Sequence, residues 1–160
     1  MAMIPPLDSR GLLPCGIHEA TWAEVQARFA YNPQRLRLIE NARDFAKTRL
    51  APLSALGVGR LIIAGSTFSD KPNPSDIEMT LEIQVAHLTP DGLQLTLLLQ
   101  ANHDGIKEEQ GVDFYTTYVL PGVQSFVDYF QYVGEKTAQM KALNNKDLRG
   151  VIEVIAWPHG

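Results

Sequence analysis

Two carboxylates and a Gly-Ser pair form the segment of this sequence with the clearest chemical potential. The apolar run Leu61–Ala64 ends in Gly65-Ser66, and a turn-rich loop follows. Asp76 and Glu78 come after this loop, and each is followed directly by an apolar residue. Side chains two apart in a strand project from the same face, roughly 6.5–7 Å from one another. Because carboxylate oxygens suit hard cations such as Mg²⁺, the segment predicts a divalent-metal site.

The same segment offers groups that bind phosphate. Gly65 would let the backbone approach a phosphate closely, and Ser66 supplies a hydroxyl and a backbone N–H. Lys71 lies in the loop that follows. Mg²⁺ or Mn²⁺ ions would activate the attacking oxygen and stabilise the leaving oxygens of an in-line phosphoryl displacement. We therefore expect Gly65, Ser66 and Lys71 to bind a nucleoside triphosphate.

A third carboxylate is expected on a neighbouring strand. Asp113 stands at the start of an aromatic and β-branched run over residues 112–120, which is typical of a strand. It could ligate a metal or act as the base for an acceptor hydroxyl. It could also be only a turn or capping residue after Gly111.

These residues resemble the motif of the DNA polymerase β-like nucleotidyltransferase superfamily. That motif is an apolar strand ending in Gly-Ser, a spacer near ten residues, two carboxylates separated by an apolar residue, and a later carboxylate. Gly65-Ser66, Asp76-Ile77-Glu78-Met79 and Asp113 match it in turn. More closely, the chain resembles small nucleotidyltransferase-like proteins that share an opening like Leu13–His18 and a late stretch like Ser125–Gln131.

The resemblance implies metal-dependent transfer of a nucleoside monophosphate to a hydroxyl of a small molecule, an RNA or a protein. Asp76, Glu78 and Asp113 would be its catalytic and metal-binding residues. Several small members belong to toxin–antitoxin or phage defence systems and act on a partner protein. Glu78 stands where Asp is commoner in active members, so a second hypothesis is a catalytically inactive binding protein: an antitoxin, immunity protein or phage inhibitor.

Simpler interpretations need no ligand. Asp76, Glu78 and Glu82 would form the solvated face of an amphipathic strand over residues 76–85, and Ser66 would initiate a turn. The aromatic residues of the second half could stack a base, although packing under the sheet is the simpler expectation: Phe114, Tyr115, Tyr118, Phe126, Tyr129, Phe130 and Tyr132.

Start and stop signals predict the surrounding elements. Thr21 and Glu24 form a capping box for a helix to about residue 29, and Asn32-Pro33 begins a helix to about residue 56 that Pro52 kinks or ends. The other expected elements are strands over 61–64, 76–85, 112–120 and 151–156, a helix over 89–101, a helical turn over 125–132, and polar loops over 66–75 and 102–110, with no element assigned to the polar residues 134–147.

These elements predict an α/β (α+β) fold: a mixed or mostly antiparallel sheet with helices on one face. Residues 1–20 would be an extended Pro/Gly-rich arm, and residues 21–160 a single nucleotidyltransferase-like domain. The net charge of −4 disfavours a protein that coats duplex nucleic acid. The single cysteine, Cys15, and the absence of a signal-like or membrane-spanning run favour a cytoplasmic protein.

Overall fold

The computed structural model describes residues 4–56 and 58–159. A five-stranded sheet with the strand order β1-β5-β2-β3-β4 runs through its centre. The strands are β1 (Gly16–Ala20), β2 (Val58–Ala64), β3 (Ile77–Gln84), β4 (Val112–Val119) and β5 (Gly150–Val154). β2 pairs antiparallel with both β3 and β5, whereas β1–β5 and β3–β4 are parallel pairs. The sheet is therefore mixed, which confirms the predicted α+β fold.

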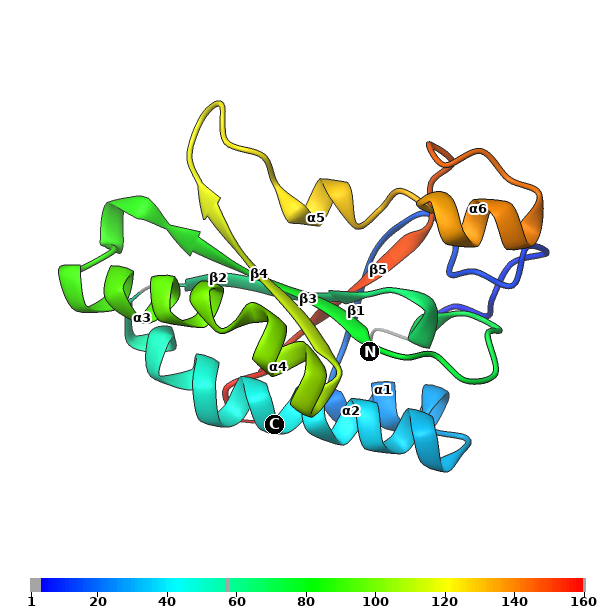
Figure 1. The fold of residues 1–160 in the computed structure, drawn as a ribbon, viewed down its shortest axis with the longest axis horizontal. Coiled ribbons are helices and arrows are strands. Elements are labelled where there is room, and N and C mark those ends of the chain that lie inside the picture. Colours follow the sequence, from blue (N-terminus) through cyan, green and yellow to red (C-terminus); the bar gives the residue numbers. More distant parts are fainter. Residues whose placement is uncertain (1–3, 57, 160) are drawn as a thin grey trace.

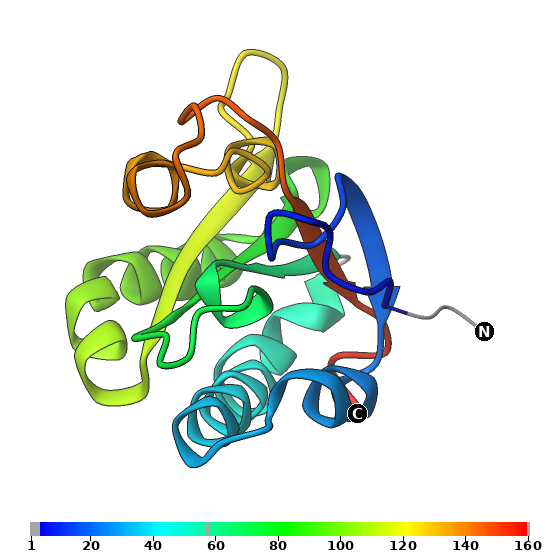
Figure 2. The same ribbon diagram turned by 90° about the vertical axis from the view of Figure 1, so that its right-hand side faces the viewer.

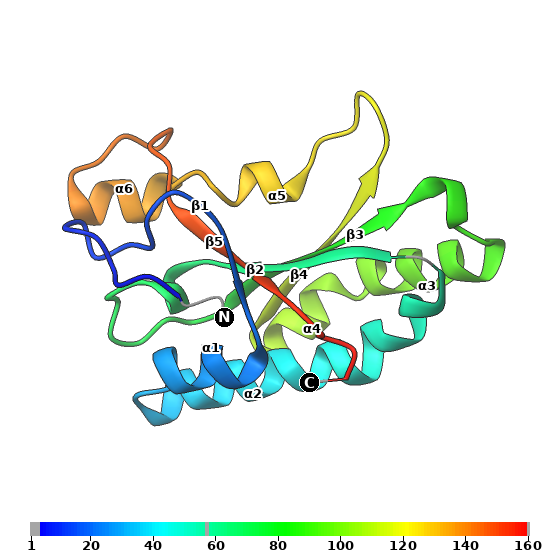
Figure 3. The same ribbon diagram turned by 180° about the vertical axis from the view of Figure 1, so that it is seen from behind.

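The four longer helices cover one face of this sheet, and two short helices lie on the other (Figure 1). Figures 2 and 3 show the same division from the side and from behind. The covering helices are α1 (Trp22–Phe29), α2 (Pro33–Phe45), α3 (Pro90–Ala101) and α4 (His103–Gln110), and the short ones are α5 (Phe126–Tyr129) and α6 (Glu135–Lys141). The sequence predicted helices on one face, and α5 and α6 add a partial second layer.

Alternation along the strands creates two separate cores. Successive strand side chains point to opposite faces, so Leu61 and Ile63 join the large core under the helices, whereas Ile62 and Ala64 belong to a smaller cluster with Val127 of α5. The large core also takes every second residue of β3 and the buried faces of α1 and α2. The smaller cluster anchors α5 to the opposite face.

The predicted helix starts are confirmed. The Thr21 hydroxyl accepts a hydrogen bond from the backbone N–H of Glu24, and the Glu24 carboxylate accepts one from the backbone N–H of Thr21, as the capping box requires. The Asn32 side chain caps α2. α2 continues through a π-helical turn (Ala46–Leu50) into a 3-10 turn (Ala51–Leu56). The π-helical turn gives way to the 3-10 turn at Ala51, directly before Pro52. Proline has no backbone N–H to donate, so it interrupts the helical hydrogen bonds at this point.

Two polar segments are helical where no helix was predicted. Residues 103–110, expected to be a loop, form α4, and residues 135–141 form α6. Each helix buries little apolar surface, with Ile106 the buried residue of α4 and Ala138 that of α6. Their hydrophobic periodicity is therefore too weak to predict a helix. α4 ends at Gly111, whose φ of 70° is the left-handed conformation of a helix C-cap.

The predicted N-terminal arm is extended but partly built into the sheet. Gly16–Ala20 forms the edge strand β1, and Leu12 makes an isolated bridge with Ser69. Burial alternates along β1, with Ile17 and Glu19 exposed and Ala20 buried. The part of the arm over residues 1–3 lies outside the described residues. Among the described helices, none is long and apolar enough to cross a membrane.

Candidate functional site

The three predicted carboxylates lie together where β3 and β4 begin. Parallel pairing places Glu78 of β3 directly opposite Asp113 of β4. Asp76 precedes β3 by one residue and, being two residues before Glu78, shares its side of the sheet. All three line one cavity of about 820 Å³. The structure thus brings the predicted catalytic residues to one place.

Ser66 of the Gly-Ser pair lines this cavity, and Gly65 lies directly before it. Gly65 directly follows β2 and has a φ of 106° and a ψ of −172°, a conformation that favours glycine. A Cβ at Gly65 would lie 3.6 Å from Cγ of Glu78, an ordinary contact, so the backbone conformation rather than space requires glycine here. Ser66 and Lys71 line the cavity with the carboxylates. The predicted phosphate-binding residues are therefore adjacent to the predicted metal ligands.

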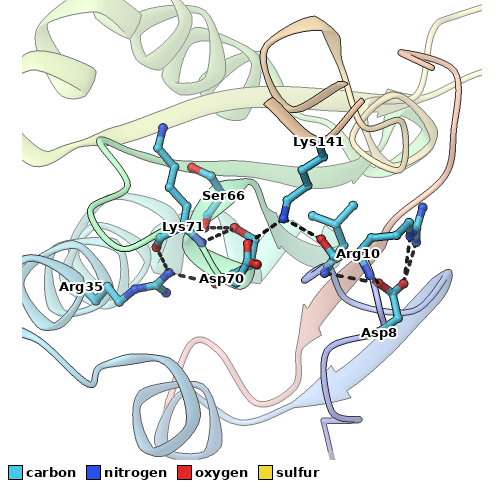
Figure 4. A network of polar contacts seen from close by, with 9 residues as sticks. Asp8, Arg10, Arg35, Ser66, Asp70, Lys71 and Lys141 are labelled. Atoms are coloured by element: carbon cyan, nitrogen blue, oxygen red, sulfur yellow. Dashed lines mark hydrogen bonds and ion pairs between the residues drawn. The ribbon is translucent and has the colours of Figure 1, made fainter. Parts of the chain in front are cut away.

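Arg35 of α2 holds the loop that carries Ser66 and Lys71 (Figure 4). It is fully buried, and its guanidinium donates to the backbone carbonyls of Thr67, Ser69 and Lys71, at 2.9 Å for Ser69. Burial lowers the pKa of Arg35. The donors of a guanidinium are held in one rigid plane. Because Arg35 binds three carbonyls of the loop at once, it fixes the path of the loop.

The far side of the same loop is tied to α6 and to the N-terminal segment. Lys141 Nζ lies 2.7 Å from Oδ1 of Asp70 and 2.5 Å from the carbonyl oxygen of Arg10 (Figure 4). The backbone N–H of Asp70 also donates to the carbonyl of Gly11. A Cβ at Gly11 would lie 2.1 Å from Oδ2 of Asp70, and the φ of 74° at Gly11 is in the left-handed region that favours glycine. The segment around Gly11 thus supports the site loop.

Each carboxylate already has a cationic partner within the chain. Arg149 Nη2 lies 2.9 Å from Oε2 of Glu78. Burial raises the pKa of Glu78; Arg149 opposes this shift, and the nearby charges of Asp76 and Asp113 add to it. The raised pKa shows that Arg149 does not fully offset the cost of burying the Glu78 charge.

One ammonium group lies between the other two carboxylates. Lys107 Nζ of α4 is 3.6 Å from Oδ2 of Asp76 and 3.8 Å from Oδ2 of Asp113. His103 Nε2, also on α4, is 2.5 Å from Oδ1 of Asp113. α4 therefore supplies two nitrogen groups to the acidic end of the cavity, and neither was singled out in the sequence.

The three carboxylates meet only part of what a metal site requires. In residues 4–56 and 58–159, no group of three or more His, Cys, Asp or Glu side chains is arranged to hold a metal ion. Asp76 and Asp113 nevertheless share one cation, the Lys107 ammonium, which lies between their oxygens. Glu78 is engaged by Arg149. Asp76 and Asp113 are therefore the two carboxylates that a divalent ion would have to share in place of Lys107.

Basic residues that the sequence did not indicate line the same cavity. Besides Lys71 and Lys107, they come from α6, from the loop after it and from the residue before β5: Lys136, Lys141, Lys146 and Arg149. Their spacing in the sequence matches no motif, because they come together only in the folded protein. Asp70 and Glu135 line the cavity as well, and Lys141 and Arg149 are ion-paired with Asp70 and Glu78, so the cavity mixes cationic and acidic side chains.

A smaller aromatic cavity of about 400 Å³ adjoins the carboxylates. Tyr115 of β4 stacks on Phe126 of α5, with ring centroids 4.6 Å apart and an interplanar angle of 11°. Tyr129, Phe130 and Gln124 complete its wall. Burial, reinforced by Asp113, raises the pKa of Tyr115 to about 12, so its hydroxyl stays protonated at neutral pH.

Comparison with known sequences identifies the family but no activity. No curated protein and no solved structure matches the chain. A family model described as a family of unknown function, DUF6932, matches residues 5–155. That match includes all five strands and every residue of the site described above. The chain therefore belongs to the DUF6932 family.

Proposed function

We propose that this chain is a metal-dependent nucleotidyltransferase, which moves a nucleoside monophosphate from a nucleoside triphosphate to a hydroxyl of an acceptor. The observation that carries the proposal is one cavity lined by Asp76, Glu78 and Asp113 together with Ser66 and several lysines. Carboxylates supply the ligands for a divalent ion, and the basic side chains supply charge for a triphosphate.

The basic side of the cavity would bind the β- and γ-phosphates. Ser66 offers a hydroxyl and a backbone N–H at the end of β2, and the loop behind it is held rigid by Arg35. Lys71 and Lys136 line the same cavity and would supply ammonium groups to phosphate oxygens. A rigid loop lowers the cost of ordering the binding groups when the ligand arrives.

Asp76 and Asp113 would hold Mg²⁺ or Mn²⁺, which would supply Lewis-acid stabilisation of phosphoryl oxygens. His103 keeps Asp113 in place through its 2.5 Å contact, and Arg149 neutralises Glu78. In the transfer, the acceptor oxygen bonds to the α-phosphorus, the bond from that phosphorus to the bridging oxygen breaks, and pyrophosphate leaves. The hydroxyl proton leaves to solvent water, because His103 and the metal position engage both oxygens of Asp113.

Calorimetry with nucleoside triphosphates tests the proposal. Wild type should bind them with Mg²⁺ or Mn²⁺ and much more weakly in EDTA. Asp76→Asn and Asp113→Asn should remove the metal-dependent part of binding, whereas Asp44→Asn, an exposed aspartate of α2 outside both cavities, should not. A transfer assay with labelled triphosphates then seeks the acceptor. Absence of binding under all these conditions would show that the proposal is wrong.

Lys107→Gln offers a test that does not depend on turnover. The variant removes the cation between Asp76 and Asp113, so titration with Mn²⁺ alone should show tighter binding than in wild type. Because Lys107 is half-exposed, the gain should be roughly two- to fivefold, as for exposed ion pairs. Lys136→Gln removes a lysine of the same cavity that does not lie between the two carboxylates, and it should leave Mn²⁺ affinity almost unchanged. Equal Mn²⁺ affinities in all three proteins would contradict the assigned ligands.

One observation favours a second function, a catalytically inactive binding protein that acts through a protein partner. All three carboxylates have side-chain cations as partners, which resembles a site stabilised without metal. In that case a partner recovered by pull-down should still bind the Asp76→Ala, Glu78→Ala double variant, and wild type should bind no triphosphate. Loss of the partner in the double variant would count against this function.

A further inference from the structure

The lysine-rich cavity and the aromatic cavity meet at the carboxylates. Both are lined by Glu78, Asp113, Tyr129 and Phe130. The larger cavity extends from there toward Ser66 and α6, and the smaller one toward Tyr115 and Phe126. The reacting centre of the proposed transfer would thus stand between a basic cavity and an aromatic cavity.

This arrangement fixes the direction of a bound nucleotide, if the proposed function is right. The α-phosphorus must lie at the carboxylates, where transfer occurs, and the β- and γ-phosphates lie among the lysines. The nucleoside is attached to the α-phosphate on the side opposite the β-phosphate. It would therefore extend out of the basic cavity and into the aromatic one, whose volume of about 400 Å³ is within the usual range for small-ligand pockets.

Within the aromatic cavity, one ring is more open than the others. Tyr115 lies between His103 and Phe126, with ring centroids 4.7 and 4.6 Å away, and Phe130 is buried. Tyr129 is 55% exposed and meets Phe126 edge-on, at 6.3 Å and 83°. Phe130 also lies tilted to Tyr129, at 6.4 Å and 56°, so neither of these two rings stacks on Tyr129 and its exposed part is available for stacking.

We propose that this aromatic cavity binds the nucleobase of the nucleoside triphosphate, stacked on Tyr129. Base–aromatic stacking is strong and tolerant of sequence because every base has a π-face. Gln124, an exposed amide on the same wall, can both donate to and accept from the edge of a base. Tyr129 would thus provide affinity for any base, and Gln124 would discriminate among bases.

The test compares inorganic tripolyphosphate with the four common nucleoside triphosphates, each titrated with Mg²⁺ into wild type, Tyr129→Ala and Tyr129→Phe. Wild type should bind the nucleotides more tightly than tripolyphosphate. Tyr129→Ala should lose about tenfold in nucleotide affinity and nothing in tripolyphosphate affinity. Tyr129→Phe keeps the ring and should resemble wild type. Gln124→Ala should change the affinity ranking among the four nucleotides.

The outcomes separate this inference from the function on which it rests. If tripolyphosphate and nucleotides bind wild type equally, or if Tyr129→Ala weakens both equally, the phosphate site stands and the base subsite is wrong. If neither ligand binds wild type, the proposed function fails, and the base subsite fails with it. Circular dichroism of Tyr129→Ala checks that the fold is intact, so that a loss of binding is assigned correctly.

Discussion

The two faces of the sheet have different roles: one packs the main apolar core, and the other carries the candidate site. Under the long helices, β3 presents Ile77, Met79, Leu81 and Ile83, all fully buried in one apolar core. On the opposite face, the same strand presents Glu78 and other polar residues toward cavities and charged partners. Because strand residues alternate in direction, a single strand contributes to stability with one set of side chains and to the candidate site with the other.

The largest expected effect comes from breaking the helix-covered face. Phe45 of α2 is fully buried against Phe114, with ring centroids 5.3 Å apart. Phe45→Ala should lower the free energy of unfolding by about 3–5 kcal/mol, since it removes a large buried ring and leaves a cavity. Urea unfolding measures this. Tyr129→Ala, which truncates an exposed ring on the other face, is the matched comparison and should cost about 1 kcal/mol or less. Equal losses would mean that the two faces contribute alike to stability.

Much of this division could be predicted from the sequence. The alternation over residues 76–85 predicts the face of β3 that enters the large core, whereas Thr80 on the predicted open face is buried as well. Such features are local, because strand direction and caps depend on neighbours in the chain. The site residues contributed by β2 and β3 were therefore found by spacing alone.

The rest of the site depends on contacts between distant segments. Arg149 reaches Glu78 across 71 positions, and Asp113 stands opposite Glu78 only because β4 pairs in parallel with β3. Lys107 and His103 lie on α4, which was expected to be a loop because its sequence is polar. No spacing in the sequence encodes these contacts, since they arise from sheet order and helix packing rather than from local patterns.

A smaller effect should come from Arg35, which belongs to the helical layer but organises the site loop. Arg35→Lys keeps the charge and loses the planar fork, so one ammonium cannot hold the carbonyls of Thr67, Ser69 and Lys71 together. We expect a loss of about 1.5–3 kcal/mol in unfolding free energy and weaker binding of tripolyphosphate. Arg37→Lys, on the exposed side of α2, is the control and should change neither. Unchanged phosphate affinity in Arg35→Lys would show that the two faces are independent of one another.

The smallest predicted effect concerns charge on the open face, away from the cavities. Arg60 holds Glu82 closely, at 2.7 Å from Nε to Oε1, but its Nε is 3.7 Å from Oε1 of Glu153. Burial raises the pKa of Glu153, with Arg60 opposing and Glu19 and Glu82 adding to the shift. The charged form of Glu153 is therefore less favourable in the folded protein than in the unfolded chain.

The sign of the pH dependence follows from that shift. Well below the ordinary pKa of 4.5, Glu153 is protonated in both states and has no effect on stability. As the pH rises above 4.5, the unfolded chain loses its proton first, so folding stability falls until the folded state also ionises. Glu153→Gln removes this cost, and it should be slightly more stable than wild type at about pH 7, within about 0.5 kcal/mol, and equal to it in acid. Urea unfolding across this pH range measures the difference, and a variant less stable than wild type at neutral pH would mean that the longer Arg60 contact outweighs burial.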